Sequence, residues 1–286
     1  MDVSERRACK AISQPRTTQR YKPKRRDKDK ALTDEIRRLA RRYPRYGYRF
    51  ITAKLRQEGW PVNHKRVQRI WRKEALQVHY RPQHSKSAGC SENSCAVKKA
   101  LYKDHVWTYD FTSDQSEDGR SLKFLTVLDE FTRESLAIEV GTSIRARDVI
   151  AVLEYLFAVR GVPDGIRSDN GPEFVADAIK KWLGDNYVET LYIEPPQPWE
   201  NGYIESFNGR FRDEVLNREL FYSVAEAKVI VQRWRNEYNH HRPHSGLGYR
   251  TPAEFAASCI ASAPPPAALQ QYTTEQVHNS LTPTGT

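Results

Sequence analysis

Apolar positions between residues 104 and 258 recur with two different periods. Short apolar and aromatic runs predict three successive strands, VWTYDFT, SLKFLTVLDEFT and ESLAIEV, separated by the turn-prone SEDGR and the EFTRES corner. Helical spacing then predicts a long amphipathic helix in ARDVIAVLEYLFAVRG, which ends at Gly161 before Pro163. The chain therefore changes from strands to helices within this region.

The rest of the region alternates between the two periods. It predicts a short strand at GIRS, a helix at GPEFVADAIKKWLGDN and a strand at VETLYIEPP. Two closing helices follow, WENGYIESFNGRFRDEVLN and SVAEAKVIVQRWRNEYNHHR. Three meandering strands followed by alternating helices and strands predict an α/β core of the RNase H-like type, in which helices flank a mixed five-stranded sheet. This core spans residues 104–258, including a C-terminal helical extension.

Residues 31–76 predict a small all-α domain of three short helices. Thr33 can cap the first helix, and Asn63 can cap the third. The third helix has an apolar face of Val67, Ile70 and Trp71. Its outward side chains are Lys65, Arg66, Gln68, Arg69, Arg72 and Lys73. The layout is typical of a helix-turn-helix unit whose third helix enters a DNA major groove. The alternative is a helical bundle whose basic face is only solvated.

The remaining segments are polar. Residues 1–30 are strongly basic and predict a disordered arm, or one that orders on DNA. Residues 77–103 predict a linker, and residues 259–286 a disordered, proline-rich tail.

Charge divides the chain sharply. The first 100 residues carry 28 Lys and Arg against 9 Asp and Glu, whereas the remaining residues carry 18 against 27. Such asymmetry indicates a nucleic-acid-binding front and a separate, acid-lined body.

The four cysteines show no spacing of a disulfide framework, which favours a reduced cytosolic protein. The set His79, His84, Cys90 and Cys95 suggests a zinc site, but its spacing fits no common structural zinc module, so we interpret it as part of the linker. No apolar run approaches the length of about 20 residues that spans a bilayer, and the N-terminus lacks the apolar region of a signal peptide.

Three carboxylates carry the candidate chemistry. Asp110 lies within the first predicted strand, Asp169 directly follows the strand GIRS, and Glu205 lies on a predicted helix. Three acids brought together make an all-oxygen pocket suited to Mg²⁺ or Mn²⁺. Taken singly, each could be a solvated, turn or capping acid, and Glu173 is a rival carboxylate near Asp169.

The predicted helix around Glu205 has two faces. Asn201, Asn208, Gly209 and Arg212 lie on neighbouring turns of the face that carries Glu205. The opposite, core-facing stripe is formed by Ile204, Phe207, Phe211 and Val215. We therefore expect Asn208 and Arg212 to contact DNA beside the acid.

The strings VWTYDFT, IRSDNGPEF and ENGYIESFNG resemble the DDE signature of transposases and retroviral integrases, including the 35 residues between Asp169 and Glu205. Over residues 30 to 258 the chain resembles bacterial insertion-sequence transposases of the OrfB type, with an integrase catalytic core. The resemblance implies metal-dependent DNA strand cleavage and strand transfer. It also implies that Asp110 contacts two Mg²⁺ ions, which Mn²⁺ can replace, and that Asp169 and Glu205 hold one each.

The same resemblance implies interaction partners and a cellular location. We expect double-stranded DNA as substrate, a homo-oligomer on DNA, no membrane association and a cytoplasmic bacterial location. The start of the chain shows no heptad run, so we expect an upstream OrfA-type subunit or fusion to recognise the element ends. Two alternatives are an inactive, integrase-like DNA-binding regulator and an RNase H-like nuclease. A late basic segment with His240, His241, Arg242 and His244 indicates phosphate contact or packing under the helix of Glu205, in preference to a metal site.

Overall fold

A computed structural model of the chain describes residues 3–21, 27–78, 99–168, 177–192 and 202–259. The chain divides into two compact units, Met1–Arg81 and Pro82–Thr286, and the division falls inside the predicted linker. The predicted tail, apart from Cys259, and most of the predicted linker lie outside the described residues.

The basic N-terminal segment contains two short helices where the sequence predicts a disordered arm. These are α1 (Glu5–Ala11) and α2 (Arg16–Gln19). The guanidinium of Arg20, at the end of α2, lies 2.7 Å from the Glu5 carboxylate, and Cys9 of α1 is buried. This ion pair and the buried thiol explain why the segment adopts local structure although its composition is polar.

Three helices, α3 (Asp27–Arg42), α4 (Tyr48–Gln57) and α5 (His64–Lys73), form the rest of this unit, as the apolar pattern predicts. The Asn63 side chain accepts a hydrogen bond from the Lys65 backbone N–H and caps α5, as expected. The prediction that Thr33 caps the first helix is wrong, because α3 begins at Asp27 and Thr33 lies inside it.

The core of α3, α4 and α5 consists of their apolar stripes. It contains Leu32, Ile36, Leu39, Ile51, Leu55, Val67, Ile70 and Trp71. Aromatic residues also pack here, since Tyr46 is buried and stacks on Tyr43 at 4.7 Å. Each of α4 and α5 is also tied to α3 by an ion pair beyond its C-terminus, Arg38 with Glu58 and Arg37 with Glu74.

The second unit is built on a five-stranded mixed sheet, as predicted. Its strands are β1 (Val106–Gln115), β2 (Ser121–Asp129), β3 (Ser135–Gly141), β4 (Gly165–Ser168) and β5 (Glu189–Tyr192). The strand order is β3-β2-β1-β4-β5. The first three strands form an antiparallel meander, whereas β4 runs parallel to β1 and β5 parallel to β4.

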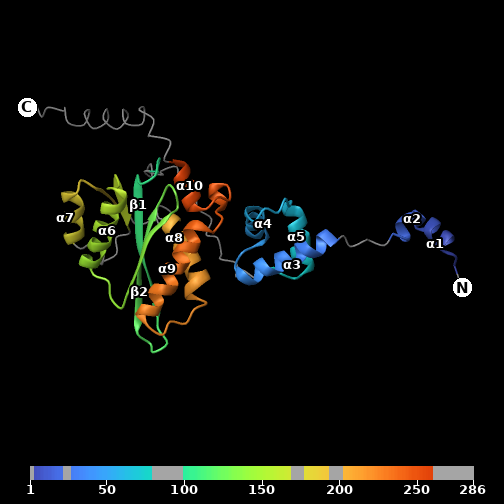
Figure 1. The fold of residues 1–286 in the computed structure, drawn as a ribbon, viewed down its shortest axis with the longest axis horizontal. Coiled ribbons are helices and arrows are strands. Elements are labelled where there is room, and N and C mark those ends of the chain that lie inside the picture. Colours follow the sequence, from blue (N-terminus) through green and yellow to red (C-terminus); the bar gives the residue numbers. More distant parts are fainter. Residues whose placement is uncertain (1–2, 22–26, 79–98, 169–176, 193–201, 260–286) are drawn as a thin grey trace, which may run out of the picture. The chain divides into compact units, whose positions relative to one another are not determined.

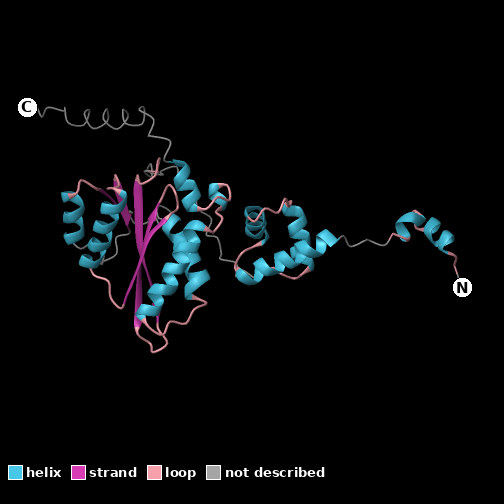
Figure 2. Cartoon of the chain, viewed as in Figure 1, coloured by secondary structure: helices cyan, strands magenta, loops and turns pink. Residues whose placement is uncertain are grey.

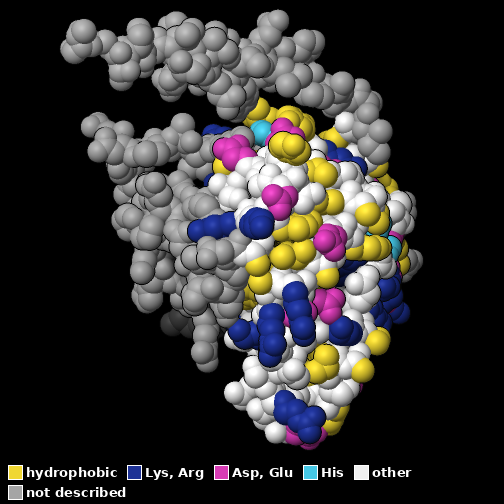
Figure 3. Space-filling view, turned by 90° about the vertical axis from the view of Figure 1, so that its left-hand side faces the viewer, with side chains coloured by type: hydrophobic (Ala, Val, Ile, Leu, Met, Phe, Trp, Pro, Cys, Tyr) yellow, Lys and Arg dark blue, Asp and Glu magenta, His cyan; other side chains and the backbone are white. Residues whose placement is uncertain are grey.

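Helices cover both faces of this sheet (Figures 1 and 2). On one face lie α6 (Ala146–Arg160) and α7 (Asp177–Asp185), which pack on Trp107, Tyr109 and other apolar side chains of the sheet. On the other lie α8 (Gly202–Phe211) and α9 (Val224–His240). The side of the unit with α6 and α7 mixes apolar with Lys and Arg side chains at its surface (Figure 3).

Two elements near the C-terminus were not predicted, a 3₁₀ turn, η3 (Ser245–Leu247), and the helix α10 (Pro252–Cys259). The predicted helix of residues 199–217 includes, after α8, a segment of π-helical form, η2 (Arg212–Leu216). A capping box begins α10: the Thr251 Oγ1 accepts from the Glu254 N–H at 3.2 Å, and the Glu254 carboxylate accepts from the Thr251 N–H at 2.8 Å.

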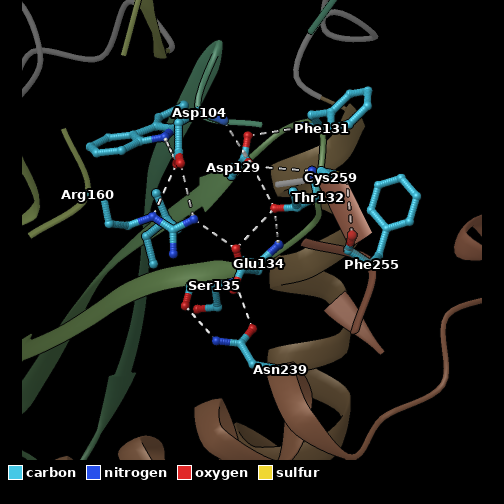
Figure 4. Close-up of polar contacts among 12 residues, drawn as sticks. Asp104, Asp129, Phe131, Thr132, Glu134, Ser135, Arg160, Asn239, Phe255 and Cys259 are labelled. Carbon is cyan, nitrogen blue, oxygen red and sulfur yellow. Dashed lines mark hydrogen bonds and ion pairs between the residues drawn. The ribbon is translucent and has the colours of Figure 1, made fainter. Parts of the chain in front are cut away.

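A buried polar network fixes the corner between β2 and β3 (Figure 4). The Asp129 carboxylate accepts hydrogen bonds from the Thr132 hydroxyl at 2.5 Å and from the Phe131 N–H at 3.2 Å. Burial raises the pKa of Asp129 to about 6, against the lowering effect of the Thr132 bond. Next to it, Arg160 of α6 bridges Glu134 at 2.8 Å and Asp104 at 3.1 Å.

Side chains of α9 cover the start of the outer edge of β3. The Asn239 side chain accepts from the Ser135 N–H and donates to the Ser135 carbonyl oxygen, both at 2.9 Å. Arg235 donates to the carbonyl oxygen of Leu136. Further along β3, a groove of about 810 Å³ lies beside α6 and α9.

None of the helices in the described part of the chain combines the length and apolar character that crossing a bilayer requires.

Candidate functional site

Asp110 lies in the middle of β1 on the face covered by α8. Its neighbours Trp107 and Tyr109 are buried under α6 and α7, whereas Asp110 itself is half-buried. One carboxylate oxygen accepts from the Phe111 backbone N–H at 2.7 Å, and the other accepts from the Asn208 side-chain amide at 2.7 Å. Two hydrogen-bond donors therefore hold this carboxylate, one from the next residue and one from a helix 98 residues later in the sequence.

The helix α8 carries the second candidate acid. Ile204, Phe207 and Phe211 are buried and anchor the helix on the sheet, as the sequence predicts. Glu205 is exposed, and no hydrogen bond or ion pair within the described residues engages its carboxylate.

The helix of Glu205 meets the strand of Asp110 at the bond between Asn208 and Asp110. Asn208 lies three residues after Glu205, so the two side chains are neighbours on the helix surface. Because Asn208 bonds directly to Asp110, the Glu205 carboxylate stands about one helical turn from the point where α8 touches β1. Asp110 and Glu205, 95 positions apart in the sequence, thus lie on two elements that meet at this bond.

Asp169 lies outside the described residues, as does its rival Glu173. Asp169 is joined to Ser168, the last residue of β4, and β4 lies beside β1. In the parallel register of these strands, Arg167 pairs with Thr108. Among the described residues, no three His, Cys, Asp or Glu side chains gather in a group that could hold a metal ion.

The two remaining candidates on this helix differ in exposure. Arg212 is exposed, which leaves it accessible to DNA. Asn208 is only 8% exposed and bonds within the protein, so its position favours a role inside the site over the predicted contact with DNA. Asn201, predicted on the same face, lies outside the described residues.

The basic side chains of α5 lie where the sequence places them. Val67, Ile70 and Trp71 are buried, and the polar residues lie on the other faces of the helix. Exposed at this surface are Lys65, Arg69, Arg72 and Lys73, with Arg66 and Gln68 partly exposed. This surface carries four exposed positive charges, as a DNA-contacting helix requires.

The late basic segment packs under α8. Arg242 is nearly buried, and its guanidinium lies 2.7 Å from the Glu214 carboxylate in η2. The His244 ring lies edge-on to Tyr238 at 4.7 Å, and Tyr238 in turn contacts Phe207 of α8. Burial, with the nearby positive charge of Arg242, lowers the pKa of His244 to about 3. These contacts agree with the predicted packing.

His79, His84, Cys90 and Cys95, which the sequence places in the linker, lie outside the described residues. Thr126 is a neighbour of Asp110 that the sequence did not indicate. It faces Asp110 from β2, and no local pattern marks a threonine in a buried strand as part of a site.

Sequence-family models match three stretches of the chain. Two are described as integrase core domains and match residues 102–198 and 186–252. The third, described as an HTH-like domain, matches residues 26–84.

Relatives and solved structures agree with these matches. A protein of insertion element IS407 from Burkholderia multivorans is 38% identical over 95% of this chain and 97% of its own length. The transposase InsD of insertion element IS2 from Escherichia coli is 30% identical over 74% of this chain and 73% of its own. A simian T-cell lymphotropic virus intasome, in complex with PP2A regulatory subunit B56 gamma, has the same fold, with a TM-score of 0.50, 16% identity and coverage of 80% of this chain and 77% of that chain.

Proposed function

Because the chain belongs to the insertion-sequence transposases with an integrase core domain, and so is a DDE polynucleotidyl transferase, we propose that Asp110, Asp169 and Glu205 are its catalytic acids. The observation that carries this assignment is the bond between Asn208 and Asp110, which brings the helix of Glu205 onto the strand of Asp110. Thr108 of β1 pairs with Arg167 of β4 in the sheet. Asp110 follows Thr108 by two residues, and Asp169 follows Arg167 by two residues.

The family generally uses divalent metal ions, and the donor set here suits them. Both described acids offer carboxylate oxygens, the ligands that Mg²⁺ prefers, and Glu205 is open to solvent. Hydrogen bonds from Phe111 and Asn208 hold the Asp110 carboxylate in place. We infer that two Mg²⁺ ions, replaceable by Mn²⁺, are held by Asp110, Asp169 and Glu205. Bound there, the ions would lower the pKa of the attacking hydroxyl group and neutralise charge on the phosphodiester.

The protein's fold positions the acids. Asp110 is fixed on a central strand, and the buried stripe of α8 holds Glu205 at the protein surface, where DNA can approach. A water molecule or a DNA 3′-hydroxyl is the attacking group, so the reaction requires no protein nucleophile and no covalent protein–DNA intermediate. Attack by water hydrolyses the phosphodiester to a 3′-hydroxyl and a 5′-phosphate, whereas attack by a DNA 3′-hydroxyl exchanges one phosphodiester linkage for another. In both cases the attacking oxygen loses a proton and the leaving oxygen takes one.

The family binds DNA and assembles as oligomers on it. We assign the exposed basic side chains of α5 and Arg212 to contacts with double-stranded DNA. Recognition of the element ends requires, in addition, an upstream OrfA-type subunit or fusion. Binding of the chain alone to end DNA and to unrelated DNA, measured by fluorescence anisotropy in the presence and absence of that subunit, tests this point. Strong preference for end DNA by the chain alone would refute the need for a partner.

The catalytic assignment is tested by nicking and joining of DNA that carries the element ends, in Mn²⁺ and with the upstream subunit present. We expect activity in the wild type and none in the variants Asp110→Asn, Asp169→Asn and Glu205→Gln, with DNA binding retained. Glu219→Gln, which alters an exposed acid of the same unit, is the matched control and keeps activity. Activity in the Glu205→Gln variant would show that Glu205 is not a catalytic acid. Activity in Asp169→Asn together with none in Glu173→Gln would assign the role of Asp169 to Glu173.

A further inference from the structure

We propose that Thr126 and Asn208 are positioning residues, which hold the Asp110 carboxylate in the orientation that binds the metal ions. The inference rests on the proposed function, because it concerns the same three acids. It assigns a role to Thr126, a residue of β2 that has no titratable group, and it changes the role predicted for Asn208.

The geometry links three elements through one small set of bonds. Thr126 stands directly across from Asp110 in the register of β1 and β2. Its hydroxyl lies 3.0 Å from the Asn208 side-chain oxygen and 3.1 Å from the Asp110 backbone oxygen. Asn208 then donates its amide to the Asp110 carboxylate at 2.7 Å. The chain of contacts runs from β2 through α8 back to β1.

Chemistry fixes the orientation of the Asn208 amide. An ionised carboxylate only accepts hydrogen bonds, so the atom of Asn208 that faces Asp110 must be the amide nitrogen. The amide oxygen then faces Thr126, whose hydroxyl is able to donate. If the hydroxyl is removed, the amide oxygen loses this buried donor, and the orientation that presents nitrogen to Asp110 loses its support.

Burial makes these bonds specific. Thr126 is fully buried and Asn208 is 8% exposed, so water competes weakly for their polar atoms. The Phe111 N–H holds the other oxygen of Asp110, which leaves the carboxylate little freedom to rotate. Since Asn208 and Glu205 share one turn of α8, the same bond also sets the separation between Asp110 and Glu205.

The test compares Mn²⁺ binding, by isothermal titration calorimetry and by electron paramagnetic resonance, in wild type, Thr126→Val, Thr126→Ser and Asn208→Ala. Valine keeps the shape of threonine and removes the hydroxyl, whereas serine keeps the hydroxyl. Thr52→Val is the matched control, because Thr52 is a buried threonine of the other unit whose hydroxyl donates to the Tyr48 carbonyl. Asp110→Asn defines the complete loss of the site, and thermal melting is recorded for every variant.

We expect Thr126→Val and Asn208→Ala to bind Mn²⁺ about 10- to 100-fold more weakly, the range for residues that orient a metal ligand. Thr126→Ser and Thr52→Val should bind as the wild type does. Wild-type affinity in both Thr126→Val and Asn208→Ala, beside a loss in Asp110→Asn, would overturn the inference and leave the proposed function standing. Equal weak binding by wild type and Asp110→Asn would overturn the proposed function, and the inference with it. A loss in Thr126→Val that serine does not rescue would indicate a general packing effect and would also overturn it.

Discussion

The Arg242 guanidinium lies 2.7 Å from the Glu214 carboxylate, and both side chains are at least nine-tenths buried. The pair joins the segment after α9 to η2, which continues the helix of Glu205. The Trp234 ring N–H also donates to Glu214, at 3.2 Å. A charge that is buried this deeply depends on its partner.

Arg242→Met should therefore destabilise the protein by about 3–5 kcal/mol, because it leaves the Glu214 charge buried without its cation. Urea unfolding measures the free energy. The double variant Arg242→Met/Glu214→Met should recover most of the loss. Lys228→Met, which breaks an exposed ion pair with Glu139, should cost about 1 kcal/mol or less. Equal effects of Arg242→Met and Lys228→Met would contradict a buried role for Arg242.

His244 makes the stability of the protein depend on pH. Its folded pKa is lowered to about 3, whereas an unperturbed histidine titrates near 6.5. The unfolded chain therefore takes up a proton first as the pH falls, so the stabilisation is present above the unfolded pKa and is lost between about pH 6.5 and 3. By linkage, the part due to His244 amounts to about 2 kcal/mol between pH 7.5 and 5.

His244→Phe should remove this part of the acid sensitivity while keeping an aromatic ring against Tyr238. The Nε2 atom of His244 is buried without a hydrogen-bond partner among the described residues, so the change to phenylalanine breaks no hydrogen bond of that atom with them. Unfolding free energies of both proteins at pH 7.5 and pH 5 give the comparison. Parallel losses in wild type and His244→Phe would show that other groups cause the acid sensitivity.

DNA contact by α5 predicts a specific salt dependence. Arg69→Ala and Arg72→Ala should each weaken DNA binding about equally for all sequences and reduce the slope of log K against log salt by about 1. The control is Arg120→Ala, which removes an exposed arginine paired with Asp118 in the turn between β1 and β2. Unchanged slopes in both α5 variants would mean that the basic face is only solvated.

Tyr187 offers a stabilising substitution. It is 96% exposed, and its backbone is left-handed, with a φ of 58°, in the turn between α7 and β5. Asparagine tolerates this conformation better than tyrosine, so Tyr187→Asn should stabilise the protein by about 0.5 kcal/mol. Thermal melting measures the gain. Tyr222→Asn alters another exposed tyrosine without this backbone conformation and should bring none.

Local pattern was sufficient where neighbouring residues determine structure. The buried stripe of Ile204, Phe207 and Phe211 could be identified from helical spacing alone, and the strand that carries Asp110 from its short apolar and aromatic run. The start of α10 was missed although its capping signal was present, since Thr251 and Glu254 stand three residues apart around Pro252. That signal would have found the helix.

Contacts between residues far apart in the sequence could not be predicted from local patterns. Asn208 was predicted to face DNA because it is polar and lies near Glu205, but its partner Asp110 is 98 residues away. Likewise, nothing beside Thr126 in the sequence indicates that it lies opposite Asp110. Such contacts depend on which strand and helix meet, and that is decided by the whole core.

Asn239 covers part of the exposed edge of the sheet. Its amide occupies both backbone groups of Ser135 that another polypeptide would use to join the sheet at β3. A second chain is therefore prevented from extending the sheet there while α9 stays docked. Undocking of α9 would free these two groups, so α9 protects the start of this sheet edge from pairing with another chain.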